Sequence, residues 1–149
     1  MTEKLYFEDF SVGDELVGDT VTVDREHMLW FASEFDNQPM HRDPAAAQAM
    51  GLKDIIATGA HIFSLTAKSQ GGIWRRMHML PSGLGIEISF LRPIYAGDTI
   101  TAHIDVPSVR ASRKPGRGWV DTKASYLNQD QEKVAEGGGA WLLVARPEK

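Results

Sequence analysis

The chain has 149 residues and a mass of 16.5 kDa, the usual size of one domain, so we expect a single hydrophobic core over residues 1–149. Hydrophobic residues make up 42% and charged residues 24%, values that exclude a disordered or fibrous chain. The absence of cysteine excludes disulfides, thiolate metal sites and cysteine nucleophiles. The net charge of −4 does not favour a nucleic-acid partner, so we expect a small-molecule ligand.

Two features argue against a membrane partner. The longest purely apolar run, Ala140–Ala145, is far shorter than the roughly 20 residues that cross a bilayer. The N-terminal stretch carries Glu3, Glu8 and Asp9 where a signal peptide has a basic region followed by an apolar one. The sequence therefore predicts a cytoplasmic protein without a membrane span.

The first predicted helix begins after Asp24, whose side chain can cap it, and ends near Asp36. Its apolar positions follow the i, i+3, i+4, i+7 spacing of one helix face: Met28, Phe31, Ala32 and Phe35. We expect this face to be buried.

Two further helices are predicted before residue 81. Asp43-Pro44 combines a capping side chain with a proline at the first helical position, and Gly51 is the stop, so a short exposed helix is expected between them. Thr58-Gly59 opens a longer helix over residues 60–70. Its small residues and single charge favour close packing on several sides.

After Pro81 the apolar residues alternate with polar ones, which is the pattern of half-buried strands. In the first of these strands Ile86, Ile88 and Phe90 share the apolar face. Five strands are predicted in all, over residues 86–90, 100–106, 120–126 and 133–144, with a shorter one near Val21 and Val23.

We expect the strands at 86–90, 100–106 and 120–126 to follow one another as an antiparallel meander. In the last strand Gly137–Gly139 indicates a bulge or a close approach of another backbone. One buried helix against a curved antiparallel sheet is an α+β architecture, and the order of the elements favours it.

A polar loop, residues 36–43, lies between two predicted helices, where functional groups are common. Gln38 precedes a proline and Pro39 fixes its own φ, so the segment forms a defined turn. Fully extended, the chain from Asp36 to His41 spans about 17 Å at about 3.4 Å per residue, so a turn is needed to bring both to one water molecule. Together they would form a general acid/base pair. The alternatives are that Asp36 only ends the helix and that His41 only bonds a backbone carbonyl.

The pattern Asp36-x-x-Pro39-x-His41-x-Asp43 resembles the active-site signature of the MaoC-like acyl dehydratases, the (R)-specific enoyl-CoA hydratases of the hotdog fold. The likeness extends over most of the chain in four motifs that follow one another in sequence. They are Phe10-x-Val12-Gly13-Asp14, the loop signature, Gly59 with Ser64 five residues later, and Phe90-x-x-Pro93-x-x-x-Gly97-Asp98. The resemblance implies a curved antiparallel sheet wrapped around a long central helix.

The resemblance also implies catalytic roles for four residues. Asp36 and His41 would hold and activate, as base and acid, the water that adds to the double bond of a trans-2-enoyl thioester. Gly59 would bind the thioester oxygen through its backbone N–H, since the first N–H groups of a helix are unsatisfied and favour negative charge. Ser64 would orient Asp36 or the water. On the residues alone, Gly59 can be a loop glycine and Ser64 a small packing residue.

We expect five further residues to bind the substrate: Gln38, Thr58, His61, Arg113 and Lys114. Gln38 stands where the family's commonest form has asparagine, and Thr58 where it often has histidine, which bears on substrate choice. His61 can line the acyl pocket or be a hydrogen-bonded core histidine. Arg113 and Lys114 suit the phosphates of coenzyme A, or they belong to a solvated hairpin.

The leading hypothesis is a homodimeric acyl-CoA hydratase/dehydratase that uses no cofactor, coenzyme A being part of the substrate. The histidines at positions 27, 41, 61, 78 and 103 have no ligand spacing, so no metal site is predicted. A hotdog thioesterase and a non-catalytic acyl-thioester binding domain stay open as alternatives. A dimer, or a higher assembly of dimers, is expected because a sheet around one helix leaves edges and an apolar face that a second copy can cover.

Overall fold

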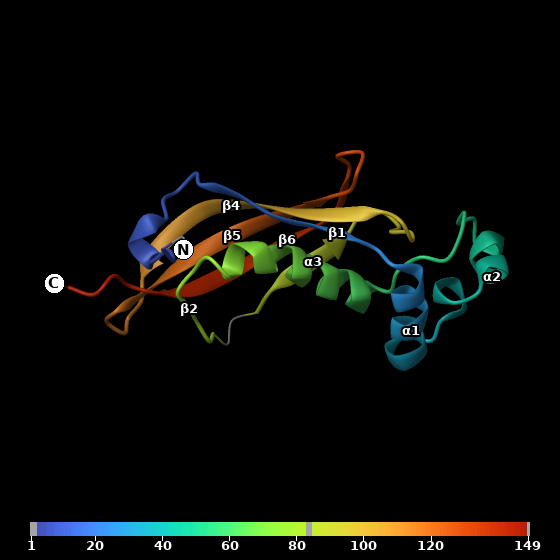
Figure 1. Cartoon of the computed structure of the whole chain (residues 1–149), viewed down its shortest axis with the longest axis horizontal. Coiled ribbons are helices and arrows are strands. Elements are labelled where there is room, and N and C mark those ends of the chain that lie inside the picture. The colour runs from blue at the N-terminus through green and yellow to red at the C-terminus, as the bar shows by residue number, and fades with distance from the viewer. Residues whose placement is uncertain (1–2, 83–84, 149) are drawn as a thin grey trace.

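In the computed structural model, which describes residues 3–82 and 85–148, one long helix lies along a six-stranded antiparallel sheet that curves around it (Figure 1). The strands are β1 (Glu15–Thr22), β2 (Met79–Leu80), β3 (Glu87–Phe90), β4 (Thr99–Ala111), β5 (Arg117–Leu127) and β6 (Lys133–Val144). The helices are α1 (Arg25–Phe35), α2 (Pro44–Ala49) and α3 (Gly59–Trp74), with the 3-10 turns η1 (Phe7–Asp9) and η2 (Pro39–His41). The predicted α+β architecture is confirmed.

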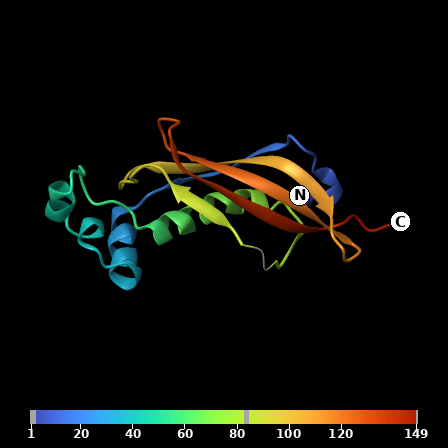
Figure 2. The same cartoon turned by 180° about the vertical axis from the view of Figure 1, so that it is seen from behind.

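The strands are ordered β1-β4-β5-β6-β2, and β3 also pairs with β6. The predicted meander is wrong for β3, which lies beside β6 and not beside β4 (Figure 2). The sheet also has one strand more than expected. The extra strand, β2, has only two residues, which is too short for an alternating pattern to reveal.

The chain between β3 and β4 crosses the end of the sheet instead of making a hairpin. Ile94, in the middle of this connection, is 1% exposed, and its carbonyl accepts a 2.9 Å hydrogen bond from the Ala57 N–H. Farther on, the Gly97 N–H donates to the Val23 carbonyl next to β1. β4 therefore starts beside β1, because burial of the connection carries the chain away from β3.

Helix α1 begins where it was predicted, since the Asp24 carboxylate accepts a 2.9 Å hydrogen bond from the His27 N–H. Met28 and Ala32 are buried, but Phe35 is 66% exposed, so the expected burial of the whole face is wrong. The reason is the position of α1, which stands with α2 at one end of the molecule, beyond the sheet (Figure 1). Only the part of α1 that faces the rest of the chain is covered.

Helix α2 is short and mostly exposed, as predicted. The Asp43 carboxylate caps it by accepting a 2.9 Å hydrogen bond from the Ala45 N–H. Gly51 ends the turn with a φ of +86°, a left-handed conformation that glycine adopts without strain.

Helix α3 is longer than expected and reaches Trp74. One side of it is buried against the sheet, through His61, Ile62, Leu65, Thr66, Ser69 and Ile73. The opposite side exposes Phe63, Ser64 and Lys68. The expectation of close packing on several sides is therefore wrong for a single chain, because the sheet covers only one side of the helix.

A single serine joins the middle of α3 to two strands. The register between β1 and β4 shifts between Val17 and Thr20, which frees backbone groups of both strands from the ladder. The Ser69 hydroxyl, which is fully buried, donates to the Asp19 carbonyl at 2.6 Å and accepts from the Ala102 N–H at 2.8 Å. The helix is thereby held at one position along the sheet.

Strand β3 lies at the edge of the sheet and is poorly covered. Ile88 is half-buried, but Ile86 and Phe90 are 59% and 48% exposed, so the predicted half-buried face is wrong at both of these positions within one chain. The cause is that β3 is an edge strand, which pairs with β6 alone among the described strands.

The glycines of β6 mark a close backbone approach. A Cβ at Gly137 would collide with the carbonyl oxygen of Glu87 in β3, and one at Gly138 with the carbonyl oxygen of Thr122 in β5. The register shift between β5 and β6 lies at Tyr126, away from the glycines, so the alternative of a bulge at these residues is wrong.

The core lies between α3 and the sheet and includes Leu65, Ile73, Ile100, Ile104, Val120 and Leu143. Among residues 3–82 and 85–148, no helix is long and apolar enough to cross a membrane. The cytoplasmic location stays a prediction.

We expect Ser69→Ala to lower the free energy of unfolding by about 1–3 kcal/mol, because it leaves a buried N–H and a buried carbonyl without their partner. Urea unfolding measures the change. Ser64→Ala is the matched control, since the Ser64 hydroxyl is exposed and its one partner among the described residues is the Ala60 carbonyl of its own helix. Equal losses in the two variants would contradict the role of Ser69.

Candidate active site

The turn after α1 places the Asp36 carboxylate and the His41 imidazole side by side. Gln38 is extended and Pro39 begins η2, so the chain reverses at once. The His41 N–H closes the turn by donating to the Gln38 carbonyl at 3.0 Å. As a result, His41 Nε2 lies 3.6 Å from Asp36 Oδ2.

The His41 ring is buried and held by the backbone. Its Nδ1 lies 2.8 Å from the Ile56 carbonyl oxygen. A carbonyl can only accept a hydrogen bond, so Nδ1 carries the proton. In the neutral ring Nε2 is then an acceptor, and it faces Asp36.

The Asp36 carboxylate is oriented by its neighbour Gln38. The Gln38 side-chain amide donates to Asp36 Oδ1 at 2.7 Å, which leaves Oδ2 for the side of His41. The Nε2 to Oδ2 distance of 3.6 Å is too long for a direct hydrogen bond. Two acceptors at this spacing can share one water molecule as donor to both. Gln38, assigned to substrate binding from the sequence, contacts the carboxylate in this structure.

The first turn of α3 offers a backbone donor. The Thr58 side chain accepts from the His61 N–H at 3.0 Å, and the Thr58 carbonyl accepts from the Ile62 N–H at 2.9 Å. Thr58 is 1% exposed. Its side chain serves as the helix cap through this bond to the His61 N–H. The Gly59 N–H has no acceptor among the residues that the structure describes. It is available to a ligand at the positive end of the helix dipole.

A cleft of about 320 Å³ brings the donor and the imidazole together. Gly59 and His41 both line it, together with Phe90 of β3. A Cβ at Gly59 would lie 3.0 Å from the Phe90 ring. A side chain at this position would therefore crowd the cleft next to the backbone N–H. The sequence motifs contain Gly59 and Phe90 but carry no signal for the Ile56 carbonyl, because a backbone oxygen leaves no trace in residue type.

Ser64 is not brought to the pair. Its side chain is exposed on α3 and donates to the Ala60 carbonyl at 3.0 Å. Within one chain, no hydrogen bond between the described residues links it to Asp36 or His41.

His61 is buried between α3 and α1. Its ring stacks on Phe31, with centroids 4.8 Å apart and planes at 8°. Its Nδ1 has no hydrogen-bond partner among the described residues. Burial, together with the nearby His27, lowers the pKa of His61 below the ordinary 6.5.

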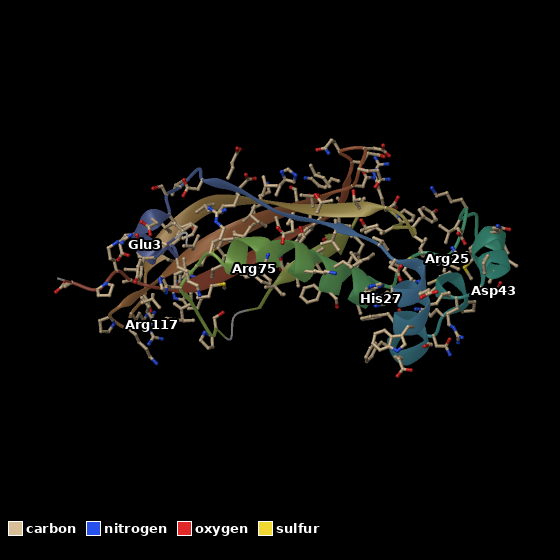
Figure 3. The ribbon with its side chains drawn as sticks, in the orientation of Figure 1. Glu3, Arg25, His27, Asp43, Arg75 and Arg117 are labelled. Atoms are coloured by element: carbon tan, nitrogen blue, oxygen red, sulfur yellow. The ribbon has the colours of Figure 1, made fainter. Side chains whose placement is uncertain are left out.

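The basic hairpin between β4 and β5 lies at the other end of the molecule. Figure 3 shows Arg117, at the start of β5, far from His27 and Asp43 at the α1–α2 end. Arg113 and Lys114 belong to this hairpin and line an open cavity of about 690 Å³. They do not share the cleft of His41 within one chain.

Metal binding has no support from clustering. Among residues 3–82 and 85–148, no three His, Asp or Glu side chains lie close enough together to hold an ion. The absence of a metal from the reaction stays a prediction.

Comparison with known proteins identifies the family. A profile described as the MaoC like domain matches residues 9–126. A UPF0336 protein of Streptomyces avermitilis is 29% identical over 139 residues, which cover 86% of this chain and 87% of that protein.

Two solved structures are similar over almost the whole chain. The MaoC-like dehydratase from Rhodospirillum rubrum has a TM-score of 0.83 and 29% identity, with 97% of this chain and 99% of that chain covered. A conserved hypothetical protein of Mycobacterium tuberculosis with a double hotdog fold has a TM-score of 0.81 at 20% identity, with 98% of this chain and 46% of that chain covered. The hotdog fold is therefore confirmed.

The lowered pKa of His61 predicts a loss of stability in acid. Unfolded His61 takes up a proton as the pH falls below about 6.5, whereas the folded ring resists, so the unfolded state binds more protons there. The stabilisation is complete above this pH and is lost on acidification. Thermal unfolding at about pH 7.5 and about pH 5.5 measures the drop in Tm.

His61→Phe keeps the stack on Phe31 and removes the titrating group, so its Tm should fall less than that of the wild type over this range. His103→Gln, which changes a half-buried histidine of β4, is the control and should show the full drop. An unchanged drop in His61→Phe would contradict the prediction.

Proposed function

This chain belongs to the MaoC-like dehydratase family, and we propose that it is a hydratase that adds water reversibly to a trans-2-enoyl-CoA to give an (R)-3-hydroxyacyl-CoA. The observation that carries the proposal is the pair of acceptors at His41 Nε2 and Asp36 Oδ2, 3.6 Å apart. The cleft that His41 lines also contains the backbone of Gly59. Addition of water to a double bond conjugated with a thioester needs a proton-transfer pair and a donor for the thioester oxygen.

Water is activated by His41 and oriented by Asp36. The proton on Nδ1 is held by the Ile56 carbonyl, so Nε2 receives the proton of the water while the water oxygen bonds to C3 of the enoyl group. The electron pair of the C2–C3 double bond shifts to the C1–C2 bond and the carbonyl electron pair moves to the thioester oxygen, giving an enolate. The Asp36/His41 pair then returns the proton held on Nε2 to C2, so all atoms of the water are in the product. Asp36 stabilises the imidazolium that forms in between.

The enolate oxygen is stabilised by the Gly59 N–H. This donor belongs to the first turn of α3 and has no acceptor among the described residues, so its orientation is set before the substrate binds. Loss of one such donor typically lowers the rate by about 10²–10³-fold. Because the pair and the donor hold the substrate between them, hydroxyl and proton arrive on the same face of the double bond.

A homodimer follows from the uncovered face of the chain. Large apolar side chains are exposed on and beside the edge strand β3: Phe63, Met79, Ile86, Phe90 and Leu91. A twofold dimer paired through β3 covers them, and its two sheets run in opposite directions. The basic hairpin of one copy then lies toward the α1 end of the other. There Arg113 and Lys114 can bind the phosphates of coenzyme A.

Hydration of crotonyl-CoA in deuterated water tests the proposal. We expect loss of absorbance of the conjugated double bond and formation of the (R)-3-hydroxyacyl product with a single deuterium at C2. Asp36→Asn and His41→Ala should each lower kcat/KM by at least about 10²-fold. The fold-loss in kcat/KM of the double variant should be far smaller than the product of the two single fold-losses, because the pair acts as one unit.

Asp105→Asn removes an exposed carboxylate of β4 and serves as the control, with wild-type activity expected. An (S) product or full additivity of the two losses would overturn the mechanism. Release of free thiol as the main reaction would identify a thioesterase, and tight binding without turnover would identify a binding domain.

The dimer predicts a mass in solution of twice 16.5 kDa by light scattering. Ile86→Asp should shift the protein toward the monomer, because it places a charge in the apolar contact. Val12→Asp is the control: Val12 is 65% exposed, close to the 59% of Ile86, and precedes β1 at the other edge of the sheet. A wild-type monomer at micromolar concentration would contradict the arrangement.

A further inference from the structure

A second cavity of about 270 Å³ lies between α3 and the inner face of the sheet. Part of its lining is apolar, with Ile88 of β3 and Trp141 of β6 among the lining residues. It is large enough to hold a segment of an acyl chain.

This cavity lies next to the cleft of His41, although no described residue lines both. Ile62 and Phe90 line the cleft, while Phe63 and Ile88 line the cavity. Residues 88 and 90 point to the same face of β3, so the cavity and the cleft are neighbours along this strand. A ligand bound at Gly59 by its thioester oxygen can therefore extend between α3 and β3 into the cavity.

A polar pair lines the cavity. The Gln70 side-chain amide donates to the Tyr126 hydroxyl at 2.8 Å, and Tyr126 is only 5% exposed. Gln70 Oε1 has no donor among the residues that the structure describes. The pair thus presents a free acceptor beside a hydroxyl, which can be satisfied by a group that both donates and accepts.

The charge of the cavity selects against ions. Glu87 is the one ionisable lining residue besides Tyr126, and no Lys, Arg or His of the described chain lines it. Burial raises the pKa of Tyr126, so the phenol stays neutral at physiological pH. A carboxylate would have no cation to pair with and would meet Glu87, whereas a neutral hydroxyl has a partner.

We propose, on the basis of the hydratase function above, that this cavity binds the far part of the acyl chain and that Gln70 and Tyr126 recognise a hydroxyl group on it. Along α3, Gly59 and Gln70 are separated by about 16 Å at about 1.5 Å per residue. An extended chain covers about 1.2 Å per bond, and helix side chains lean toward the N-terminus, so the hydroxyl lies about ten to fourteen bonds from the thioester.

Calorimetric titration with saturated thioesters tests the subsite without any reaction at C2 or C3. The probes are dodecanoyl-CoA, 12-hydroxydodecanoyl-CoA and the mono-CoA thioester of dodecanedioic acid. We expect the hydroxylated probe to bind about three- to tenfold more tightly than dodecanoyl-CoA, the worth of one neutral hydrogen bond. The diacid thioester should bind more weakly than both.

The variant Gln70→Leu/Tyr126→Phe removes both polar groups together, so neither is left buried without its partner. It should bind dodecanoyl-CoA as the wild type does and lose the preference for the hydroxylated probe. A purely structural pair would change Tm and leave the preference intact. Lys68→Gln, at an exposed position of the same helix, is the control and should keep the preference.

Equal binding of the hydroxylated and plain probes by the wild type would overturn the subsite, and this comparison needs no variant. A preference that survives in the double variant would overturn the assignment to Gln70 and Tyr126. Crotonyl-CoA is too short to reach the cavity, so its hydration tests the proposed function separately. No hydration together with retained hydroxyl preference would refute the hydratase and leave the subsite standing.

Discussion

The bond of the Ser69 hydroxyl to both β1 and β4 sets the position of α3, and the site is arranged along this helix. Ser69 is fully buried and fills the gap that the register shift opens between the two strands. At Gly18, in the same irregularity, a Cβ would collide with the Ser69 carbonyl oxygen, so the helix backbone lies directly on the strand. A slip of α3 would leave buried backbone groups unpaired, which is costly. The helix therefore has one permitted register.

With the helix in place, its two ends serve different parts of one elongated site. The N-terminal turn meets the loop of His41, whose ring is fixed because Nδ1 is bonded to the Ile56 carbonyl at 2.8 Å. Farther along, Gln70 meets Tyr126 of β5 at 2.8 Å. The reacting end is formed by backbone groups and a short turn, and the far end by side chains across a cavity. Proton transfer and chain recognition thus depend on separate contacts of the same helix.

The beginnings and ends of the first two helices were predictable from local chemistry. The caps at Asp24 and Asp43 and the stop at Gly51 depend on neighbouring residues only, and all three lie where the sequence places them. The partner of β3 and the exposure of Phe35 were not predictable in this way. An apolar side chain shows that some surface must cover it, but the identity of that surface depends on the path of the whole chain.

The sequence by itself determined the helices, the long strands, the turn at Pro39 and the residue types that can move a proton, because these follow from backbone sterics, capping and periodicity over a few residues. Only the tertiary structure decided that β3 pairs with β6 and that the basic hairpin lies at the far end from His41. It also decided that Gln70 and Tyr126, which are 56 residues apart, share one cavity. Contacts at such separations are set by the packing of α3 on the sheet, to which no short stretch of sequence corresponds.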